Sequence, residues 1–448
     1  MKDNNRSDGI AREAAVLVSV LPPGVAYHED PLDELAGLAE TAGARVVGRL
    51  TQRRETPDKT TYLGAGKVEE LRVLAEANDA DVICFDNDLS PAQTRNLEKA
   101  TNVKVLDRSE LILDIFASRA QTYQARLAVE LAQMEYSLPR LKRMWTHLSR
   151  MKMGIGMRGP GEKQIESDRR LVEKRIHDFR TELKDIAKRK VREVAARNER
   201  MTVSLVGYTN AGKSTLLNAL TGADVLTENR LFATLDTRTR RWQLPGWGPV
   251  LLSDTVGFIR DLPHHLIESF KATLEEARQA DLLLHVADAS NPSVREQVSS
   301  VFKVLEELKI EAKDTLLVLN KADAAPNRAV LDSLTQMYPN AIPISARSGH
   351  GLDRLASAVS DALSRGFCDI DVETEVGNGR VLAFLAAQGE ILSQHYNDTA
   401  VLVHCRLPRA AAGRLMRDPA VRVRFHGNAF AGQDNGSGAA LGPVEDVA

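Results

Sequence analysis

One segment combines glycines, a lysine and a serine at the spacing that holds a phosphate chain. Residues 207–214 read Gly-Tyr-Thr-Asn-Ala-Gly-Lys-Ser and lie between an apolar run at 203–206 and a helical pattern at 215–220. Backbone N–H groups of such a loop point at phosphate oxygens where a helix begins, and the helix dipole favours anions there. Lys213 would reach the β- and γ-phosphates, and Ser214 would offer Mg²⁺ a hydroxyl ligand. The motif predicts that a nucleoside triphosphate is bound by Gly207, Tyr208, Thr209, Asn210, Ala211, Gly212, Lys213, Ser214 and Thr215.

A second motif places a carboxylate at the end of another apolar run, because residues 249–253 lead into Asp254. An acid at the carboxyl end of a strand can hold Mg²⁺, directly or through a water. The backbone N–H of Gly257 is free to sense the γ-phosphate. This motif adds the nucleotide-binding residues Asp254, Thr255, Val256 and Gly257.

The segment 231–237 lies between these two motifs and has the position of a first switch. One hydroxyl in this region must complete the Mg²⁺ shell when the γ-phosphate is present. We assign that role to Thr234, with Thr237 and Thr239 as the alternatives. The switch residues expected near the nucleotide are Phe232, Ala233, Thr234, Leu235 and Asp236. Lys213, Thr234 and Gly257 form the predicted catalytic group.

Two further motifs decide which base is bound. Asn320-Lys321-Ala322-Asp323 follows the apolar run 315–319, and Ser345-Ala346-Arg347 follows another strand. The carboxylate of Asp323 can accept from guanine N1–H and N2–H₂ together, whereas adenine offers neither donor. A site built on such polar partners rejects the wrong base by on the order of 10⁴. The four motifs in this order, with a further apolar strand at 281–286, predict a guanine-nucleotide-binding domain.

The motifs leave open which group orients the attacking water. The residue after Gly257 is Phe258, which can neither accept nor donate a hydrogen bond. A partner can supply the missing group or order the switches. Alternatively, a monovalent cation held by Asn210 and the switch backbone can take the place of an arginine finger. Phe258 as a hydrophobic anchor is compatible with both routes.

The segments on either side of this domain differ in their pattern of apolar residues. Apolar strands are expected at 14–20, 45–50, 81–85 and 103–106, and helices at 32–41, 67–77 and 91–100, the last capped by Ser90. This alternation predicts a small parallel sheet. Near the C-terminus we expect a small α/β domain with a helix at 380–394 and a strand at 399–406. The chain beyond residue 428 is rich in Gly, Ala and Asp and is expected to be disordered.

Two heptad seams predict an antiparallel helical hairpin. The seam residues are Leu127, Leu131, Met134, Leu138, Leu141, Trp145 and Leu148, and then Ile165, Val172, Ile176, Phe179, Leu183 and Ile186. An arm of this length reaches roughly 40 Å or more; a plain packed helical domain is the alternative.

The loop at the tip of this hairpin, 153–162, is rich in glycine and follows a heptad helix. The GxGxxG pattern in it therefore does not predict a dinucleotide site, which requires a preceding strand. Residues 140–200 contain 19 Lys and Arg against nine Asp and Glu. Cations neutralise phosphates and glycines allow close backbone approach, so we expect Lys152, Arg158 and Lys163 to contact RNA. A solvated charged surface is the alternative.

Bulk composition sets the broad class. The 448 residues are 43% hydrophobic and 27% charged, with a net charge of −2, which fits a folded multidomain protein without a global basic field. Three distant cysteines suit a reducing compartment and argue against a disulfide or zinc framework. No apolar run approaches the length of a membrane span, and the polar start lacks the apolar stretch of a secretory signal. We therefore expect a cytoplasmic monomer without stable membrane insertion.

The chain also resembles the HflX GTPases. The residues that carry the resemblance are 62–71 (YLGAGKVEEL), 89–97 (LSPAQTRNL), 107–116 (DRSELILDIF), 158–162 (RGPGE), 232–236 (FATLD) and 254–263 (DTVGFIRDLP). The resemblance implies GTP hydrolysis with Mg²⁺, binding to the large ribosomal subunit and its rRNA, and splitting of stalled or idle ribosomes. It also implies that the arm reaches toward the peptidyl-transferase region, and that Asn210 supports potassium-assisted hydrolysis. Thr237 stands where Pro often follows the switch Asp, Lys163 where a hydroxyl residue is usual, and Arg347 where Lys is usual.

Together these patterns predict a multidomain α/β protein. The expected parts are an N-terminal α/β domain (1–108), a helical hairpin (109–200), a GTP-binding domain (201–366), a small C-terminal domain (367–427) and a tail (428–448). A ribosome-assembly or RNA-remodelling factor that uses GTP as a timer is the second hypothesis. A regulatory partner of membrane proteolysis without RNA contact is the third.

The turn Gly64-Ala65-Gly66-Lys67 is too short to decide whether the N-terminal domain holds a second nucleotide.

Overall fold

The computed structural model describes residues 13–24, 30–144, 160–196, 201–223, 231–232, 234–235, 237–245, 247–260, 274, 276–308, 310, 315–325, 328–397 and 399–425. The chain divides into two compact units, Met1–Ser360 and Asp361–Ala448. The boundary falls inside helix α12 (Leu352–Gly366).

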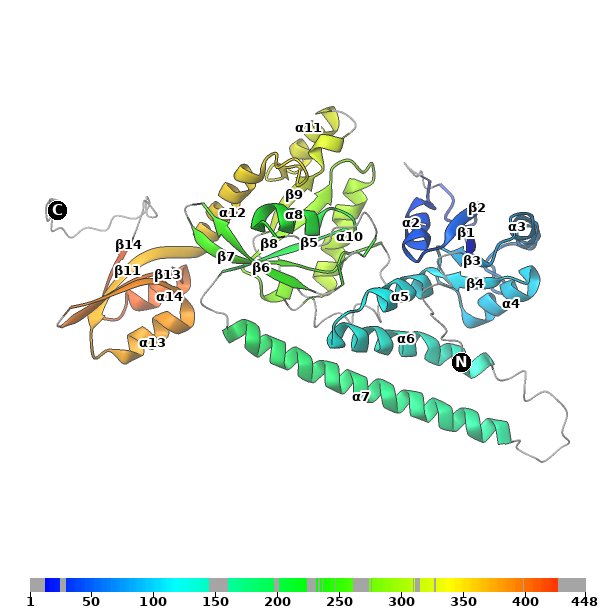
Figure 1. Ribbon diagram of the computed structural model, residues 1–448, viewed down its shortest axis with the longest axis horizontal. Helices are drawn as coiled ribbons and strands as arrows, with labels where there is room; N and C mark the ends of the chain where they lie inside the picture. Colours follow the sequence, from blue (N-terminus) through cyan, green and yellow to red (C-terminus); the bar gives the residue numbers. More distant parts are fainter. Residues whose placement is uncertain are drawn as a thin grey trace. The chain divides into compact units, whose positions relative to one another are not determined.

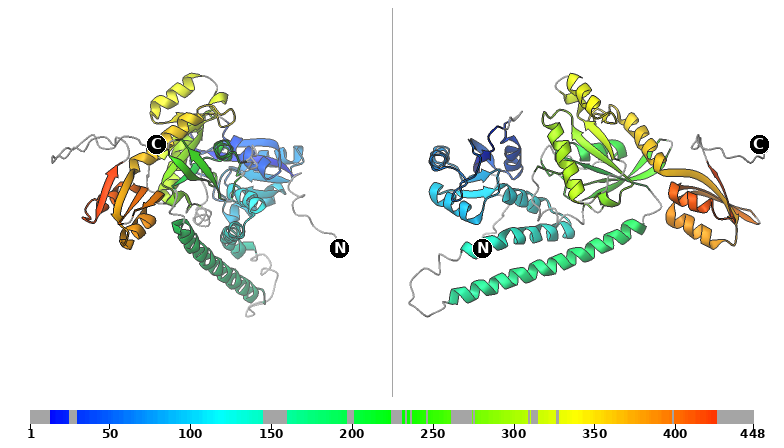
Figure 2. Two further views of the ribbon diagram at one scale, coloured as in Figure 1. Left: turned by 60° about the vertical axis from the view of Figure 1, so that its left-hand side comes forward. Right: turned by 180° about the vertical axis from the view of Figure 1, so that it is seen from behind.

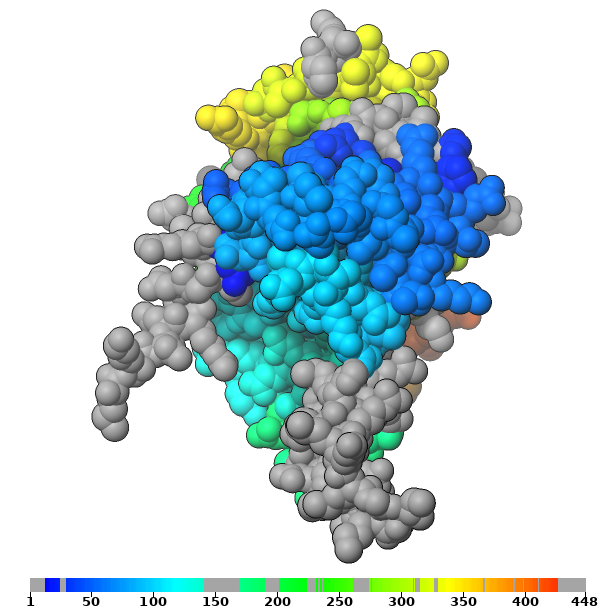
Figure 3. Space-filling model, turned by 90° about the vertical axis from the view of Figure 1, so that its right-hand side faces the viewer, coloured from blue at the N-terminus to red at the C-terminus, as the bar shows by residue number. Residues whose placement is uncertain are grey.

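The first unit begins with a small parallel sheet whose strands lie in the order β2-β1-β3-β4 (Figure 1). Its elements are β1 (Ala14–Leu21), α2 (Asp33–Thr41), β2 (Arg45–Arg53), α3 (Ala65–Ala77), β3 (Val82–Phe85), α4 (Pro91–Thr101), β4 (Lys104–Asp107) and α5 (Arg108–Arg119). Every residue of β1 is buried, as a parallel strand covered on both faces requires. Alternate residues of this strand enter two hydrophobic clusters, Leu17 one and Val16 the other. The predicted alternation of strands and helices is confirmed, as are the Ser90 cap and Pro91 at the first position of α4. In the space-filling view, the residues of this sheet and its helices, coloured blue to light blue, make up much of the face that is seen (Figure 3).

Helices α6 (Tyr123–Met144) and α7 (Pro160–Ala196) lie side by side in all the ribbon views (Figures 1 and 2). The predicted heptad seams meet between them. Leu127, Leu131, Ile176 and Leu183 are buried in one cluster, against which Met134, Leu138, Val172, Phe179 and Ile186 pack. At 1.5 Å per residue, α7 is about 55 Å long. The hairpin prediction is confirmed for the described residues, and the tip loop at 153–159 lies outside them.

The second sheet of this unit has the strand order β10-β9-β8-β5-β7-β6. Its elements are β5 (Thr202–Gly207), α8 (Lys213–Thr221), β6 (Arg238–Leu244), β7 (Gly248–Asp254), β8 (Leu282–Asp288), α10 (Val294–Glu307), β9 (Thr315–Asn320), the 3₁₀ turn η2 (Ala322–Ala324), α11 (Arg328–Met337) and β10 (Ile342–Pro343). Strand β6 is antiparallel to β7, and the other neighbouring strands are parallel. The central strand β5 therefore delivers its carboxyl end, where ligands bind in open α/β sheets, directly to the phosphate motif.

The C-terminal unit contains an antiparallel sheet of order β12-β13-β11-β14. Its elements are β11 (Phe367–Glu375), α13 (Gly379–Gln388), β12 (Glu390–Tyr396), β13 (Ala400–Pro408), α14 (Arg409–Leu415) and β14 (Val421–Phe425). The predicted helix at 380–394 is too long, because it ends at Gln388 and the chain continues as β12. A Cβ on Gly389 would lie 2.4 Å from the carbonyl oxygen of Arg406, so the chain passes close to β13 here and turns into the sheet.

Three observations test the general expectations. None of the described helices is both long enough and apolar enough to cross a membrane. All three cysteines have free thiols and are buried. Within the described ranges, no group of three His, Cys, Asp or Glu side chains has the arrangement of a metal site.

Candidate functional site

The phosphate motif forms the loop that connects β5 to α8. Two of its glycines have positive φ angles, +151° at Gly207 and +90° at Gly212. A Cβ on Gly207 would lie 2.1 Å from the carbonyl oxygen of Val286, and one on Gly212 would lie 2.3 Å from Asn320 Nδ2. Both positions therefore require glycine, because of backbone conformation and close neighbours together. The strand, loop and helix predicted around the motif are present.

Lys213 is the first residue of α8, and its side chain is buried beneath this loop. Its Nζ donates to the carbonyl oxygens of Gly207 at 3.1 Å and Tyr208 at 2.9 Å. Burial lowers the pKa of Lys213 to about 8, and the carboxylate of Asp254 opposes that shift. The ammonium is thus held next to the loop in an environment of low polarity, where an anion would interact with it strongly.

Three oxygen-bearing side chains meet beside the start of α8. Ser214 Oγ donates to Asp254 Oδ2 at 2.6 Å and lies 2.7 Å from Thr234 Oγ1. Burial raises the pKa of Asp254, against the attraction of Lys213 and the hydrogen bonds from Ser214 and Thr234. Its other oxygen, Oδ1, is buried and has no hydrogen-bond partner within the described part of the chain. Hydroxyl and carboxylate oxygens of this kind suit a hard cation such as Mg²⁺.

The two alternative switch hydroxyls face a different partner. Thr237 Oγ1 donates to Glu276 Oε1 at 3.1 Å, and Thr239 Oγ1 donates to Glu276 Oε2 at 3.3 Å. Neither of these bonds involves Ser214 or Asp254. Among the three candidates, the geometry favours Thr234.

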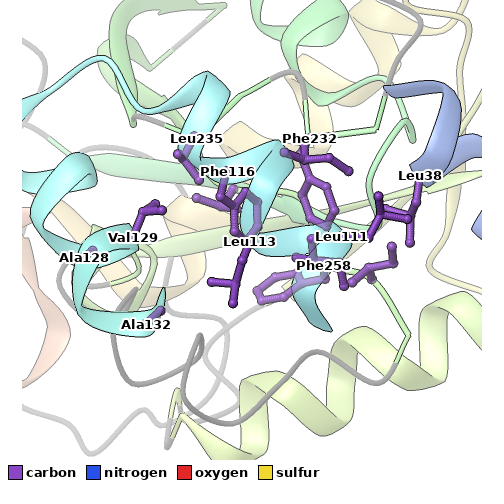
Figure 4. Packing of buried hydrophobic residues seen from close by; sticks show 14 of the residues in the cluster. Leu38, Leu111, Leu113, Phe116, Ala128, Val129, Ala132, Phe232, Leu235 and Phe258 are labelled. Atoms are coloured by element: carbon purple, nitrogen blue, oxygen red, sulfur yellow. The ribbon is translucent and has the colours of Figure 1, made fainter. Parts of the chain in front are cut away.

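The segment after Asp254 runs alongside the phosphate loop. Phe258 N–H donates to the Gly207 carbonyl at 3.1 Å, and Thr209 N–H donates to the Phe258 carbonyl at 2.7 Å. A Cβ on Gly257 would lie 2.8 Å from Thr209 Cα, so a larger residue would push the two segments apart. The Phe258 ring is buried in the hydrophobic cluster shown in Figure 4, which agrees with its interpretation as an anchor.

The base motifs meet at the neighbouring strand ends. Asn320 Nδ2 donates to the Ala211 carbonyl at 2.9 Å, and Asn320 Oδ1 accepts from Ala346 N–H at 3.0 Å. One amide therefore joins the phosphate loop to the Ser-Ala-Arg segment. Lys321 Nζ pairs with Asp288 Oδ2 at 2.6 Å, while Asp323 is exposed and open to a ligand. Asp288 was not predicted, although an acid at the end of an apolar strand is a usable signal.

The remaining predicted residues occupy supporting positions. Thr255 Oγ1 donates to the Leu205 carbonyl at 2.6 Å, and Ser345 Oγ accepts from Ser348 N–H at 3.2 Å. Asn210 has a φ of +60° and is exposed. Val256 and Leu235 are buried, Ala322 and Thr215 are half-buried, and Arg347 is exposed. Ala233, Asp236, Lys152 and Arg158 lie outside the described residues, as does the side chain of Lys163.

A polar network that the sequence did not reveal joins the phosphate loop to the N-terminal sheet. The Tyr208 hydroxyl donates to Glu34 of α2 and accepts from the backbone N–H of Arg260 at 2.8 Å. Arg108, at the start of α5, pairs with Glu34 and Asp86 and donates to the Arg260 carbonyl at 2.9 Å. The side chains come from segments far apart in the sequence, so no local pattern connects them.

A cavity of about 560 Å³ opens beside this network. The phosphate-loop residues Thr209 and Asn210 line it, together with carboxylates of α2, β8 and α10. The acidic side chains in this lining are Asp30, Asp33, Glu34, Asp288 and Glu296. Four of these carboxylates are paired with cations, Asp30 and Asp33 with Arg49, Glu34 with Arg108 and Asp288 with Lys321, and Arg260 also lines the cavity.

The open sheet, the phosphate loop on its central strand, the switch segments beside it and the base motifs at its edge define a P-loop GTPase. Family models match the chain in the same order: "GTP-binding GTPase N-terminal" at 29–117, "GTP-binding GTPase Middle Region" at 119–197 and "50S ribosome-binding GTPase" at 202–321. The GTPase HflX of Magnetococcus marinus is 43% identical over 423 residues, covering 93% of this chain and 98% of the relative. That of Escherichia coli is 45% identical over 357 residues, covering 79% and 84%. The chain belongs to the HflX GTPase family, and the protein is a GTP hydrolase.

A solved structure titled "crystal structure of SsGBP and GDP complex" is also similar to this chain. It is 25% identical, has a TM-score of 0.46, and the match covers 79% of this chain and 99% of that one.

Proposed function

We propose that this protein binds the large ribosomal subunit and uses GTP binding and hydrolysis to dissociate or rescue stalled or idle ribosomes in the cytoplasm. The observation that carries the proposal is the combination of a GTPase site with a long helical hairpin in one unit. The match to a family described as ribosome-binding GTPases supports the partner. The basic surplus near the hairpin tip supports contact with rRNA, through Lys152, Arg158 and Lys163.

At the nucleotide, Ser214, Thr234 and Asp254 would hold Mg²⁺, with Asp254 acting directly or through a water. Asp254 Oδ1, which has no hydrogen-bond partner among the described residues, and the convergence of the two hydroxyls support this role. Bound Mg²⁺ would neutralise charge on the β- and γ-phosphates. Lys213 would stabilise the same charge from the other side, and the Gly257 N–H would hold the γ-phosphate in place.

Base choice would depend on Asp323, whose exposed carboxylate can accept two hydrogen bonds from guanine. Asn320 holds the surrounding loops and Lys321 is fixed by Asp288, so Asp323 is presented on a rigid support. Asn210 would hold a potassium ion, because its side chain is exposed at the phosphate loop and can offer a cation its amide oxygen.

Water activation would depend on an ordered switch, because Phe258 is buried and has no polar group to offer. We therefore expect slow hydrolysis by the isolated protein and faster hydrolysis when large subunits order the switches. Equal rates with and without large subunits would contradict this part of the proposal.

The test is the sedimentation profile of intact ribosomes incubated with the protein and a non-hydrolysable GTP analogue. We expect intact ribosomes to convert to free subunits, with the protein sedimenting with the large subunit. GDP in place of the analogue, and a variant with K152Q, R158Q and K163Q, serve as controls and should leave ribosomes largely intact. If ribosomes stay intact with the analogue while the protein binds immature subunits, the assembly-factor hypothesis replaces this one.

A further inference from the structure

The first switch enters the nucleotide site through a socket made by the N-terminal part of the chain. The socket consists of Gly37 and Thr41 on α2 and Phe116 on α5. Leu231 N–H donates to Thr41 Oγ1 at 3.3 Å. A Cβ on Gly37 would lie 3.2 Å from Leu231 Cδ1, so glycine lets the leucine pack directly on the helix.

The next switch residue, Phe232, packs against Phe116, the α5 member of this group. Its side chain is 1% exposed. Its ring meets the Phe116 ring edge-to-face, with centroids 4.6 Å apart and an interplanar angle of 71° (Figure 4). This is a favourable arrangement for two aromatic quadrupoles.

The backbone of Phe232 is held in a conformation that a bulky residue seldom adopts. Its φ is +55°, in the left-handed region. Such strain persists only where the surroundings fix the residue from several sides. Here the Phe116 ring holds the side chain, and Thr209 Oγ1 of the phosphate loop accepts from the backbone N–H at 2.7 Å.

The position of Phe232 limits where the Thr234 hydroxyl can be. Two residues of chain span at most about 7 Å, so an anchored ring at 232 restricts the reach of residue 234. With the ring against Phe116, Thr234 Oγ1 lies 2.7 Å from Ser214 Oγ, and Thr234 is buried. The same helix, α5, also contributes Leu113 to the cluster that includes Val129 and Ala132 of α6 (Figure 4).

We propose that Phe116 is a positioning residue for GTP hydrolysis, which places the Thr234 hydroxyl at the magnesium site by fixing Phe232. A residue outside all four nucleotide motifs thereby controls the ligand shell of the metal. The inference rests on the proposed role of Thr234 as a magnesium ligand.

The test compares the affinity for a non-hydrolysable GTP analogue with that for GDP, both with Mg²⁺. The switch hydroxyl joins the metal shell only when the γ-phosphate is present, so loss of positioning should affect the triphosphate alone. For F116A we expect about tenfold weaker analogue binding and a higher Mg²⁺ requirement for hydrolysis, with GDP affinity within about twofold of the wild type. F116L, which keeps most of the volume, should show a smaller change in the same direction and serves if F116A does not fold.

The control L97A removes a buried side chain from the other hydrophobic cluster of the same sheet. It should lower thermal stability without changing the ratio of the two affinities. T234A should change that ratio at least as much as F116A. If T234A changes the ratio and both Phe116 variants leave it unchanged, the positioning role is wrong. If T234A itself leaves the ratio unchanged, the metal role of Thr234 has failed, and the inference fails with it.

Discussion

The parallel N-terminal sheet and the mostly parallel sheet of the nucleotide domain are each associated with a short turn that has two glycines and a lysine at the start of a helix. In the first sheet Gly64 caps α3 with φ −70° and ψ 151°, an ordinary extended conformation, and a Cβ on Gly66 would meet nothing within 4 Å. In the second sheet Gly207 and Gly212 have positive φ angles and neighbours that exclude a side chain. Backbone conformation and the close approach of neighbouring atoms therefore distinguish the phosphate loop from an ordinary turn with a similar amino-acid sequence.

The lysines of these two turns differ in the same way. Lys67 lies on the surface of α3 and pairs with Glu70 at 2.8 Å. Lys213 is buried and donates to two carbonyls of its own loop. The first lysine already has a carboxylate partner at the solvent-exposed surface, whereas the second is held where a phosphate would become its strongest partner.

The carboxylates at the strand ends complete the comparison. Asp107, at the end of β4, accepts from Tyr136 and from the Glu110 N–H with one oxygen and from Arg140 with the other. Asp254, at the end of β7, has one oxygen without a partner among the described residues. A fully partnered acid supports the fold, and a partly partnered one leaves a place for a cation.

The largest expected effect separates the two lysines. K213A should reduce GTP hydrolysis by on the order of 10³-fold or more, because it removes a buried charge aimed at the phosphates. K67A should leave hydrolysis unchanged, since an exposed ion pair contributes little. Single-turnover hydrolysis of labelled GTP measures both, and a comparable loss in K67A would give the first turn a catalytic role.

The second largest effect should separate the glycines of the two turns. G212A forces a Cβ toward the Asn320 amide at a positive φ, and we expect about 100-fold weaker GTP binding. G66A should keep GTP affinity and change the free energy of unfolding by at most about 1 kcal/mol, because alanine suits a helix. Equilibrium nucleotide binding and thermal melting measure these effects, and normal GTP affinity in G212A would contradict the comparison.

Substitution of the two strand-end carboxylates should affect GTP hydrolysis in one case and the free energy of unfolding in the other. D254N should lower Mg²⁺-dependent hydrolysis by roughly 10–100-fold. It should not destabilise the nucleotide-free protein, because an amide oxygen can still accept from Ser214 and Oδ1 has no hydrogen-bond partner to lose among the described residues. D107N should instead cost roughly 2 kcal/mol of stability by weakening the bond to Arg140, with GTP affinity retained. The reverse pattern would show that the two acids have been assigned the wrong roles.

The smallest effect concerns pH. Burial, with repulsion from Asp107 and Asp114, raises the pKa of Glu110 from 4.5 to about 7. The folded state then holds this proton more tightly than the unfolded state, so the contribution of Glu110 to stability falls as pH rises from about 4.5 to 7. E110Q should flatten the dependence of the melting temperature on pH in this range. The exposed E76Q is the control, and an unchanged slope in E110Q would contradict the assignment.

Local patterns predicted much of the fold and the site. The apolar strands of both sheets, the Ser90 cap and the heptad seams appear as expected, because each depends on residues close together in the chain. The helix predicted at 380–394 was too long, since periodicity alone did not register the approach of Gly389 to the backbone of Arg406. Partners such as Asp288 for Lys321, and Glu34 for Tyr208, were missed because they are brought together only by strand order and helix packing.

The sequence by itself determined the class of chemistry, GTP hydrolysis, since the nucleotide motifs are contiguous, carry their own strand and helix, and predict which residues would meet the phosphates, the metal and the base. Tertiary structure alone decided which threonine meets Ser214, what holds Phe232 in a left-handed conformation, and that α5 supplies the ring that does so. The reason is physical: a loop motif specifies its own backbone, whereas an aromatic contact between residues 116 and 232 exists only after separate segments have packed together.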